Sequence, residues 1–331
     1  MTAKLTSSTG GHPARSLRLP DGSRARLDGP LQPGVPLVLL LHGFRGGLAS
    51  MATAPEGRQS WREALLASGF STLSYEQAAP DGLLAPNLEQ LVEIAAGPLS
   101  HDSRLRRLPL AIVAHSRGGL LARLLLDRAA GSPGLHRLLD RMRSVITLHT
   151  PHAGSGLAGL AVGVDRTARR LQTAVSSLGL RPTVLAALCS LSASPAVAEL
   201  APGSPTLRAL AGRPTPAGIP WHTFGGVSAD LRRICELLGP AEPDGRASAP
   251  ARLARTRGLT EMLGVLDRLA LLSPALRDGE GDVVVADACA RLPFAASHTV
   301  NRLTHVEALW DAGLHAQVIE LLRGRSLLAV A

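Results

Sequence analysis

The chain has 331 residues, 45% of them apolar and 18% charged, which excludes a disordered or fibrous chain and favours one large globular α/β domain carrying an insertion. The formal charge is +9, but Lys4 is the only lysine and the arginines are spread from end to end without a run longer than two. Aromatic residues make up only 2% of the chain, so few side chains can stack on bases, and we expect no specific nucleic-acid partner.

The three cysteines, Cys189, Cys235 and Cys289, form neither a CxxC pair nor a disulfide-rich framework, so free thiols are expected. The first twenty residues lack the apolar segment of a signal peptide, and no stretch approaches 18 uninterrupted apolar residues. We therefore expect no transmembrane segment and a cytoplasmic location, with secretion requiring that a signal peptide has been removed.

The first half of the chain alternates between strand and helix patterns. Residues 1–34 are rich in Gly, Pro, Ser and Arg and are predicted to form a partly flexible tail, with one edge hairpin around Asp21-Gly22. A single domain is expected over 35–331, because apolar runs alternate with helical patterns as in βαβ units with a mostly parallel sheet. The predicted strands of this half are 36–42, 70–75, 110–115 and 145–148, and the predicted helices are 61–68, 87–96 and 119–129.

The pattern changes after Thr150. Amphipathic helical stretches such as 157–180 and 259–272 alternate with Pro-rich turns, and a helical insertion is predicted at 228–275. The predicted strands of this half are 219–224, 282–285 and 299–303, and the chain closes on a predicted helix at 315–323. The fold class is therefore α/β, with helices on both faces of a mostly parallel sheet.

The segment 114–119 (AHSRGG) follows a predicted strand and opens a predicted helix, which is the context of a nucleophile elbow. A serine on such a tight turn takes a strained backbone conformation, and the residues two positions away must be small, as Ala114 and Gly118 are. The helix N-terminus favours an oxyanion, and the backbone N–H of Arg117 is a candidate donor. From these residues alone, the alternative stays open that Ser116 only caps the helix.

A second segment, 39–47 (LLLHGFRGG), resembles the His-Gly loop of the α/β-hydrolase superfamily, which supplies the other oxyanion donor. On that resemblance the donor is the backbone N–H of Phe44, and two fixed dipoles stabilise the developing charge. His42 and His115 are expected to contact the substrate. Without the resemblance, an ordinary glycine-rich turn explains the segment equally well.

The same resemblance implies a triad in the chain order Ser, then Asp or Glu, then His. Asp282 lies in a segment that resembles the acid-bearing segment of lipases, and His305 follows 23 residues later, near the end of the chain. The implied roles are nucleophile for Ser116, proton carrier for His305 and orienting acid for Asp282. The residues themselves leave alternatives open at Asp278, Asp287 and His298.

Two further segments, 150–155 (TPHAGS) and 199–204 (ELAPGS), resemble bacterial triacylglycerol lipases, and the first also resembles the inositol-deacylase-like branch of the superfamily. This resemblance implies a helical lid or cap at 155–215 and no cofactor. Glu307 occupies the position at which some lipases bind a structural calcium, although the sequence does not place a second ligand. No metal site is expected, since His149 and His152 are poorly spaced to chelate zinc.

The resemblance as a whole implies a carboxylic ester hydrolase, a lipase or carboxylesterase, that acts on a small-molecule ester or lipid through an acyl-enzyme. The alternatives are an acyltransferase that uses the same triad and a non-catalytic binding protein on the same scaffold. The sequence does not determine acyl-chain length, alcohol specificity, acceptance of peptides or polyesters, or oligomeric state.

Overall fold

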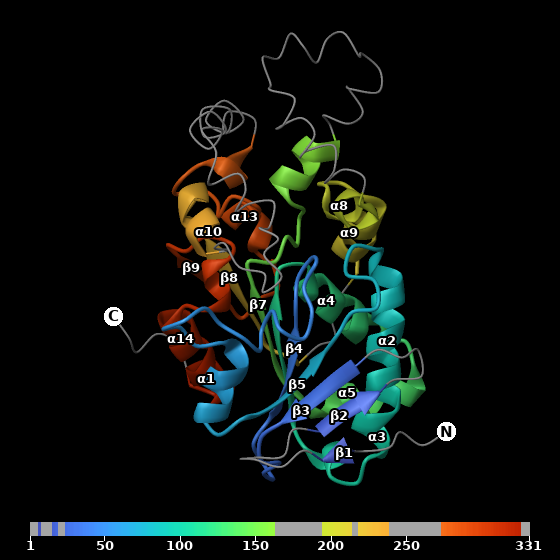
Figure 1. Ribbon diagram of the computed structural model, residues 1–331. Coiled ribbons are helices and arrows are strands. Elements are labelled where there is room, and N and C mark those ends of the chain that lie inside the picture. Colours follow the sequence, from blue (N-terminus) through green and yellow to red (C-terminus); the bar gives the residue numbers. More distant parts are fainter. Residues whose placement is uncertain are drawn as a thin grey trace, which may run out of the picture.

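The computed structural model describes residues 6–7, 15–18, 24–162, 194–213, 218–237 and 273–325. Within these residues a nine-stranded sheet crosses the molecule in the order β1-β2-β3-β5-β4-β6-β7-β8-β9 (Figure 1). Its strands are β1 (Thr6–Ser7), β2 (Arg15–Arg18), β3 (Arg24–Asp28), β4 (Leu37–Leu41), β5 (Ser71–Tyr75), β6 (Leu110–His115), β7 (Met142–Leu148), β8 (Trp221–Gly226) and β9 (Ser297–Asn301). The neighbours from β5 to β9 are parallel, whereas β1, β2 and β3 extend the β5 edge as antiparallel strands.

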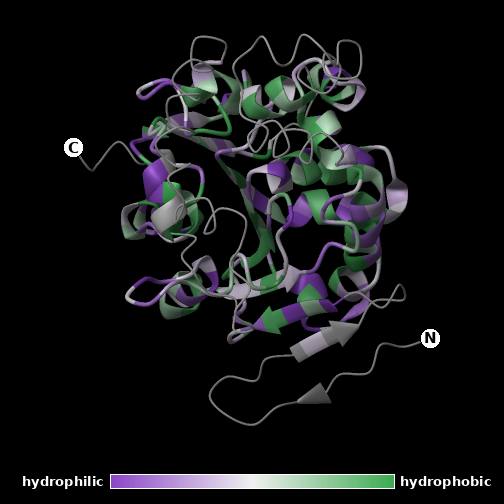
Figure 2. Ribbon diagram, turned by 45° about the horizontal axis from the view of Figure 1, so that its top comes forward, coloured by the Kyte–Doolittle hydropathy of each residue, from purple (hydrophilic) through white to green (hydrophobic). Residues whose placement is uncertain are grey.

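The central strands send alternate side chains into two apolar cores, one on each face of the sheet. In β4, Leu37, Leu39 and Leu41 belong to one core, and Val38 and Leu40 belong to the other. All five are buried, which explains why this strand is continuously apolar. Figure 2 shows the hydrophobic residues along these strands.

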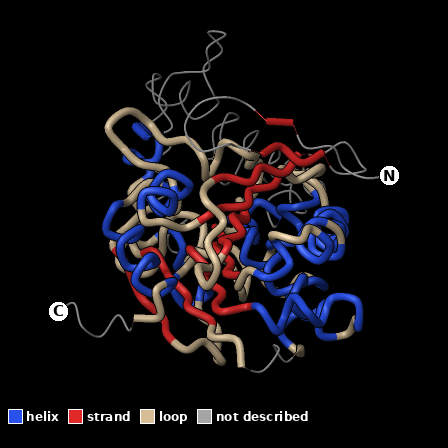
Figure 3. Tube along the Cα trace, turned by 90° about the horizontal axis from the view of Figure 1, so that it is seen from below, coloured by secondary structure: helices blue, strands red, loops and turns tan. Residues whose placement is uncertain are grey.

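Helices cover both faces of the sheet, and Figure 3 shows the strands between two groups of helices. The first core lies beneath α2 (Leu84–Ala96), α4 (Arg117–Ala130) and α5 (His136–Arg141), and the second beneath α1 (Trp61–Ala67) and α14 (Ala312–Leu322). Further helices are α3 (Pro98–His101), α8 (Pro195–Leu200), α9 (Pro205–Ala211), α10 (Leu231–Leu237) and α13 (Asp287–Ala290). Of these, α8, α9, α10 and α13 gather near the top of Figure 1. No helix among the described residues is long and apolar enough to cross a bilayer.

The predicted parallel strands are confirmed as β4 to β8, and the last one as β9, which begins two residues earlier than expected. The predicted helices 61–68, 87–96, 119–129 and 315–323 correspond to α1, α2, α4 and α14, with ends shifted by up to three residues. Of the predicted lid at 155–215, the structure describes the helical residues 156–162 together with α8 and α9. The predicted helix 259–272 and the insertion beyond α10 lie outside the described residues.

The N-terminal segment differs from the predicted tail. Strands β2 and β3 pair antiparallel, as an edge hairpin requires, although its turn lies outside the described residues. Ala25 and Leu27 of β3 are buried in the first core, so the folded domain begins before residue 35. Charged residues alternate with these two and conceal the strand in the sequence. Arg24 forms an ion pair with Glu76, and Arg26 forms one with Asp28.

The predicted strand at 282–285 is wrong, because this segment is a loop closed by a single bridge between Gly281 and Ala286. One carboxylate oxygen of Asp282 accepts the backbone N–H groups of Val284 at 2.9 Å and Val285 at 2.7 Å. A side chain that accepts the N–H groups of the residues just after it competes with strand pairing. The run of apolar residues in the sequence does not reveal this competition.

Candidate active site

Ser116 occupies the sharp turn between the end of β6 and the start of α4, with φ 54° and ψ −128°. The turn brings two chain segments very close together, since a Cβ at Gly118 would lie 2.3 Å from Leu41 O and 2.8 Å from His42 O. The Ser116 hydroxyl makes no capping hydrogen bond to α4. Capping therefore does not explain the serine, and its Oγ points instead to a histidine from the other end of the chain.

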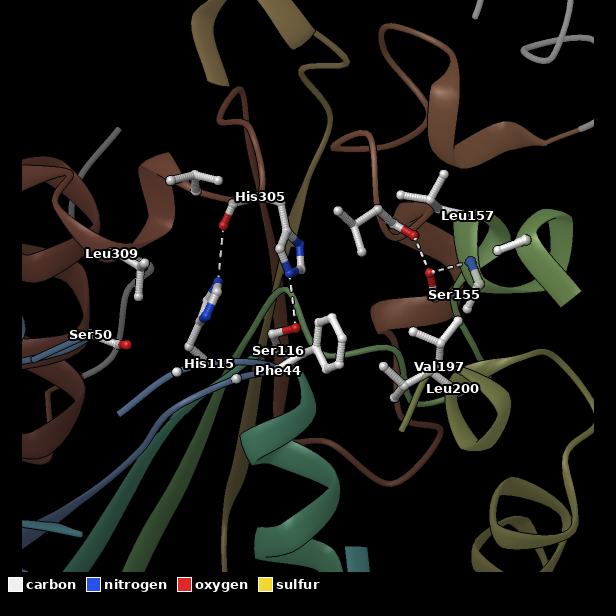
Figure 4. Close-up of a pocket in the computed structure, with 16 residues that line it drawn as sticks. Phe44, Ser50, His115, Ser116, Ser155, Leu157, Val197, Leu200, His305 and Leu309 are labelled. Atoms are coloured by element: carbon white, nitrogen blue, oxygen red, sulfur yellow. Dashed lines mark hydrogen bonds between the residues drawn. The ribbon is translucent and has the colours of Figure 1, made fainter. Parts of the chain in front are cut away.

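Ser116, His305 and Asp282 form a continuous hydrogen-bonded chain. Ser116 Oγ lies 2.9 Å from His305 Nε2 (Figure 4). His305 Nδ1 lies 2.8 Å from Asp282 Oδ2. The first two side chains are almost buried and Asp282 is completely buried. An ionised Asp282 accepts the Nδ1–H of His305, which leaves the Nε2 lone pair free to accept the serine proton.

The imidazoles around Asp282 keep its carboxyl group ionised. Burial by itself would raise the pKa of Asp282, but His305 and His149 outweigh it and hold the pKa below its usual value. His115 is also buried, and burial, followed by the nearby His305 and His149, lowers its pKa well below the usual value. His115 is therefore neutral at pH 7, and its Nε2–H donates to the carbonyl oxygen of His305 at 2.9 Å.

The other acids and the other histidine considered in the sequence lie in separate networks. Asp278 forms an exposed ion pair with Arg302. Asp287 contacts His298 at 2.8 Å and Arg291 at 2.6 Å. The structure thus brings Asp282 and His305, rather than these alternatives, to the serine.

The two expected oxyanion donors flank Ser116. The 42–44 loop passes directly beside it, because a Cβ at Gly43 would lie 2.9 Å from Ser116 Cβ. Among the hydrogen bonds of the described part of the chain, none involves the backbone N–H of Phe44 or of Arg117 as donor. Both groups are thus free to bind an oxygen, as an oxyanion hole requires.

Sequence reasoning missed the side chain of Arg117, which is completely buried under the turn. Its guanidinium donates to the carbonyl oxygens of Pro80 and Gly82 and forms an ion pair with Glu199 of α8 at 3.7 Å. It also contacts Gln77 Oε1 at 3.4 Å. Arg117 thus joins the elbow to the 77–82 loop and to α8.

A cavity of about 280 Å³ opens at Ser116. Figure 4 shows Ser50, His115 and Leu309 on one side of the Ser116–His305 pair, and the apolar Leu157, Val197 and Leu200 on the other. The remaining lining residues are Gly43, Phe44, Gly46, Ser155, Ala158, Ala161, Val284 and Val306. The wall is mostly apolar, as expected for a site that binds a hydrocarbon chain.

The structure separates the two histidines that were expected to contact substrate. His115 lines the cavity, whereas His42 is not among the lining residues and is buried beneath the loop. Nδ1 of His42 lies 3.0 Å from Gly43 O, and its Nε2 lies 3.4 Å from the N–H of Gln77. His42 therefore supports the 42–44 loop rather than facing the cavity.

The residues considered for metals have other partners. Glu307 accepts hydrogen bonds from Arg233 at 2.9 Å and from the N–H and hydroxyl of Thr304, so its carboxylate does not fit a calcium site. His152 contacts Thr147 Oγ1 at 3.1 Å. His149 turns instead toward Asp282, and the ligand atoms of His149, Asp282 and His305 lie within 4.8 Å of one another. Both imidazoles in that group lie at hydrogen-bond distance from one carboxylate oxygen.

The parallel sheet, its two helical layers and the serine on the β6–α4 turn are those of the α/β-hydrolase fold. The mature form of the lipase BlEst2 from Bacillus licheniformis has a similar structure, with a TM-score of 0.56 and 18% sequence identity, covering 90% of this chain and 97% of that chain. The propeptide form of that lipase gives a TM-score of 0.55 and 19% identity, covering 88% of this chain and 51% of that chain. No protein-family model matches the chain, and no match was found among curated proteins.

Proposed function

We propose that this protein is a serine hydrolase that cleaves carboxylic esters, as a lipase or carboxylesterase, through an acyl-enzyme intermediate. The observation that carries the proposal is the chain Ser116–His305–Asp282, whose serine faces an apolar cavity. The similarity in fold to a bacterial lipase agrees with this activity. Substrate would be a small-molecule ester or lipid whose acyl chain lies along the apolar wall.

In the first half of the reaction, Ser116 Oγ attacks the ester carbonyl carbon as its proton passes to His305 Nε2. The negative charge that develops on the carbonyl oxygen is stabilised by the N–H groups of Phe44 and Arg117. His305 Nε2–H then gives its proton to the departing alcohol oxygen, and the acyl group stays on Ser116. Asp282 stabilises the imidazolium throughout.

In the second half, a water molecule takes the place of the alcohol. His305 accepts a proton from the water, whose oxygen attacks the acyl carbon, and the same two N–H groups bind the oxyanion again. Collapse of this intermediate returns the proton to Ser116 Oγ and releases the carboxylic acid.

The test is a panel of p-nitrophenyl esters of increasing acyl length, with wild type beside Ser116→Ala. Ser116→Ala should lower kcat by at least about 10³-fold and abolish labelling by a serine-directed phosphonate. Ser103→Ala, at an exposed serine, is the matched control and should behave as wild type. Each methylene that enters the apolar cavity should raise kcat/KM about fourfold, because its burial contributes about 0.8 kcal/mol.

Retained turnover in Ser116→Ala would refute the proposal. Absence of both turnover and labelling in wild type would favour a non-catalytic scaffold instead. An acyltransferase would reveal itself by transferring the acyl group to an added alcohol or amine in preference to water.

A further inference from the structure

His149 directly follows β7 and is completely buried beside the candidate triad. Its Nδ1 lies 2.8 Å from Asp282 Oδ2, the same oxygen that His305 Nδ1 contacts at 2.8 Å. The orienting acid of the proposed mechanism therefore has two imidazole partners, although the proton transfer itself needs only one.

The backbone around His149 is shaped for this contact. The residue has φ 50°, in the left-handed region that residues other than glycine adopt uncommonly. Its ring fills the place of a side chain on β8, because a Cβ at Gly226 would lie 2.3 Å from His149 Cε1 and 2.7 Å from His149 Nδ1. The positive φ of His149 and the absence of a side chain at Gly226 thus both allow the hydrogen bond between His149 and Asp282.

The contact also determines where the protons are. The ionised Asp282 can only accept hydrogen bonds, so both imidazoles carry their hydrogen on Nδ1. The other carboxylate oxygen is held by the backbone N–H groups of Val284 and Val285. Among the described residues, His149 Nε2 has no hydrogen-bond partner, and a neutral ring leaves only a lone pair there. A charged ring would bury an unpaired N–H with its centroid 6.0 Å from that of the His305 ring, which itself becomes positive during catalysis.

We propose that His149 is a positioning residue that fixes Asp282 for His305. The backbone N–H groups of Val284 and Val285 donate to Oδ1, and His149 donates to Oδ2. The orientation of the carboxylate plane therefore stays fixed while His305 transfers a proton from Ser116 to the departing group. Without His149, His305 would be the only side chain among the described residues at hydrogen-bond distance from Oδ2. This inference rests on the proposed hydrolase function.

Two variants isolate the hydrogen bond from the backbone conformation. His149→Asn keeps an N–H donor close to the position of Nδ1, and His149→Gly has no donor, while both residues tolerate a positive φ. We expect His149→Gly to lower kcat about 10- to 100-fold with KM changed less than about twofold, since one charge-assisted hydrogen bond to the orienting acid is lost. His149→Asn should stay within about threefold of wild type. Equal losses of kcat in the two variants at equal thermal stability, or full activity in His149→Gly, would overturn the inference.

A second measurement does not depend on turnover or on the folding of the glycine variant. In wild type labelled with ¹⁵N-histidine, NMR should show His149 protonated on Nδ1 and unprotonated on Nε2, with the signals identified by their loss in His149→Asn. An Nε2–H tautomer would overturn the positioning role while leaving ester hydrolysis by Ser116 intact. Absence of ester turnover in wild type would instead overturn the proposed function, and the role of His149 with it, whichever tautomer is observed.

Discussion

Replacing Gly118 by alanine should damage stability and activity together. This glycine is the second residue of α4, and an added methyl group would meet the backbone carbonyls of Leu41 and His42 at 2.3 Å and 2.8 Å. Leu41 belongs to β4, which is held by β5 on one side and β6 on the other, so these carbonyls have little freedom to move. Helix α4 must therefore shift by about 1 Å to restore ordinary contact.

Overpacking of this kind typically costs about 1–3 kcal/mol of unfolding free energy. The same shift separates the N–H of Arg117, on the moving helix, from that of Phe44, on the loop that follows β4. A displacement of about 1 Å at a reaction centre costs about 10²-fold in rate, and the loss of one oxyanion donor costs about 10²- to 10³-fold. We expect kcat to fall by about two orders of magnitude.

The matched control is Gly134→Ala in the turn Pro133–Leu135, where a Cβ would have no atom within 4 Å. Denaturant unfolding and ester turnover should be measured for both variants. Gly134→Ala should stay within about 1 kcal/mol of wild type, because only the entropy of the unfolded chain changes. An unfolding midpoint and a kcat equal to wild type in Gly118→Ala would refute the close approach of α4 to β4.

Two further predictions concern buried polar side chains. Arg117→Met should lower the unfolding free energy by about 3 kcal/mol, because it removes the buried donor to the carbonyl oxygens of Pro80 and Gly82 and the ion pair with Glu199. Met at the exposed Arg143 should change it by less than about 0.5 kcal/mol. Similar unfolding midpoints for the two variants would argue against a stabilising role of the Arg117 side chain. Burial lowers the pKa of His152 well below its usual value, so the unfolded chain binds an extra proton below about pH 6.5 and stability falls as the pH falls. In His152→Gln, the unfolding free energy should fall less steeply with decreasing pH, by up to about 1.4 kcal/mol per pH unit, when urea unfolding is measured between about pH 4.5 and 7.5. The same dependence of the unfolding free energy on pH in wild type and variant would contradict the lowered pKa of His152.

The sequence was sufficient for those features whose signal is local. The parallel strands are buried on both faces, so each appears as a short continuous apolar run, as in β4 and β6. The small residues around Ser116 indicate its turn because only they allow the helix to approach the strand. Motif resemblance and chain order were enough to suggest Asp282 and His305, which lie close to Ser116 in the folded chain.

Only the tertiary structure decided the features that depend on contacts between distant segments. The alternating apolar and charged residues of β3 form a strand because β3 pairs with β5. The apolar residues after Asp282 form a loop instead of a strand, because the Asp282 side chain accepts the N–H groups of Val284 and Val285. The sequence likewise contains no sign that His149 meets Asp282 133 residues later, or that the side chain of Arg117 reaches α8. Such contacts join residues that no local periodicity relates, and they form only when the sheet brings the ends of its strands together.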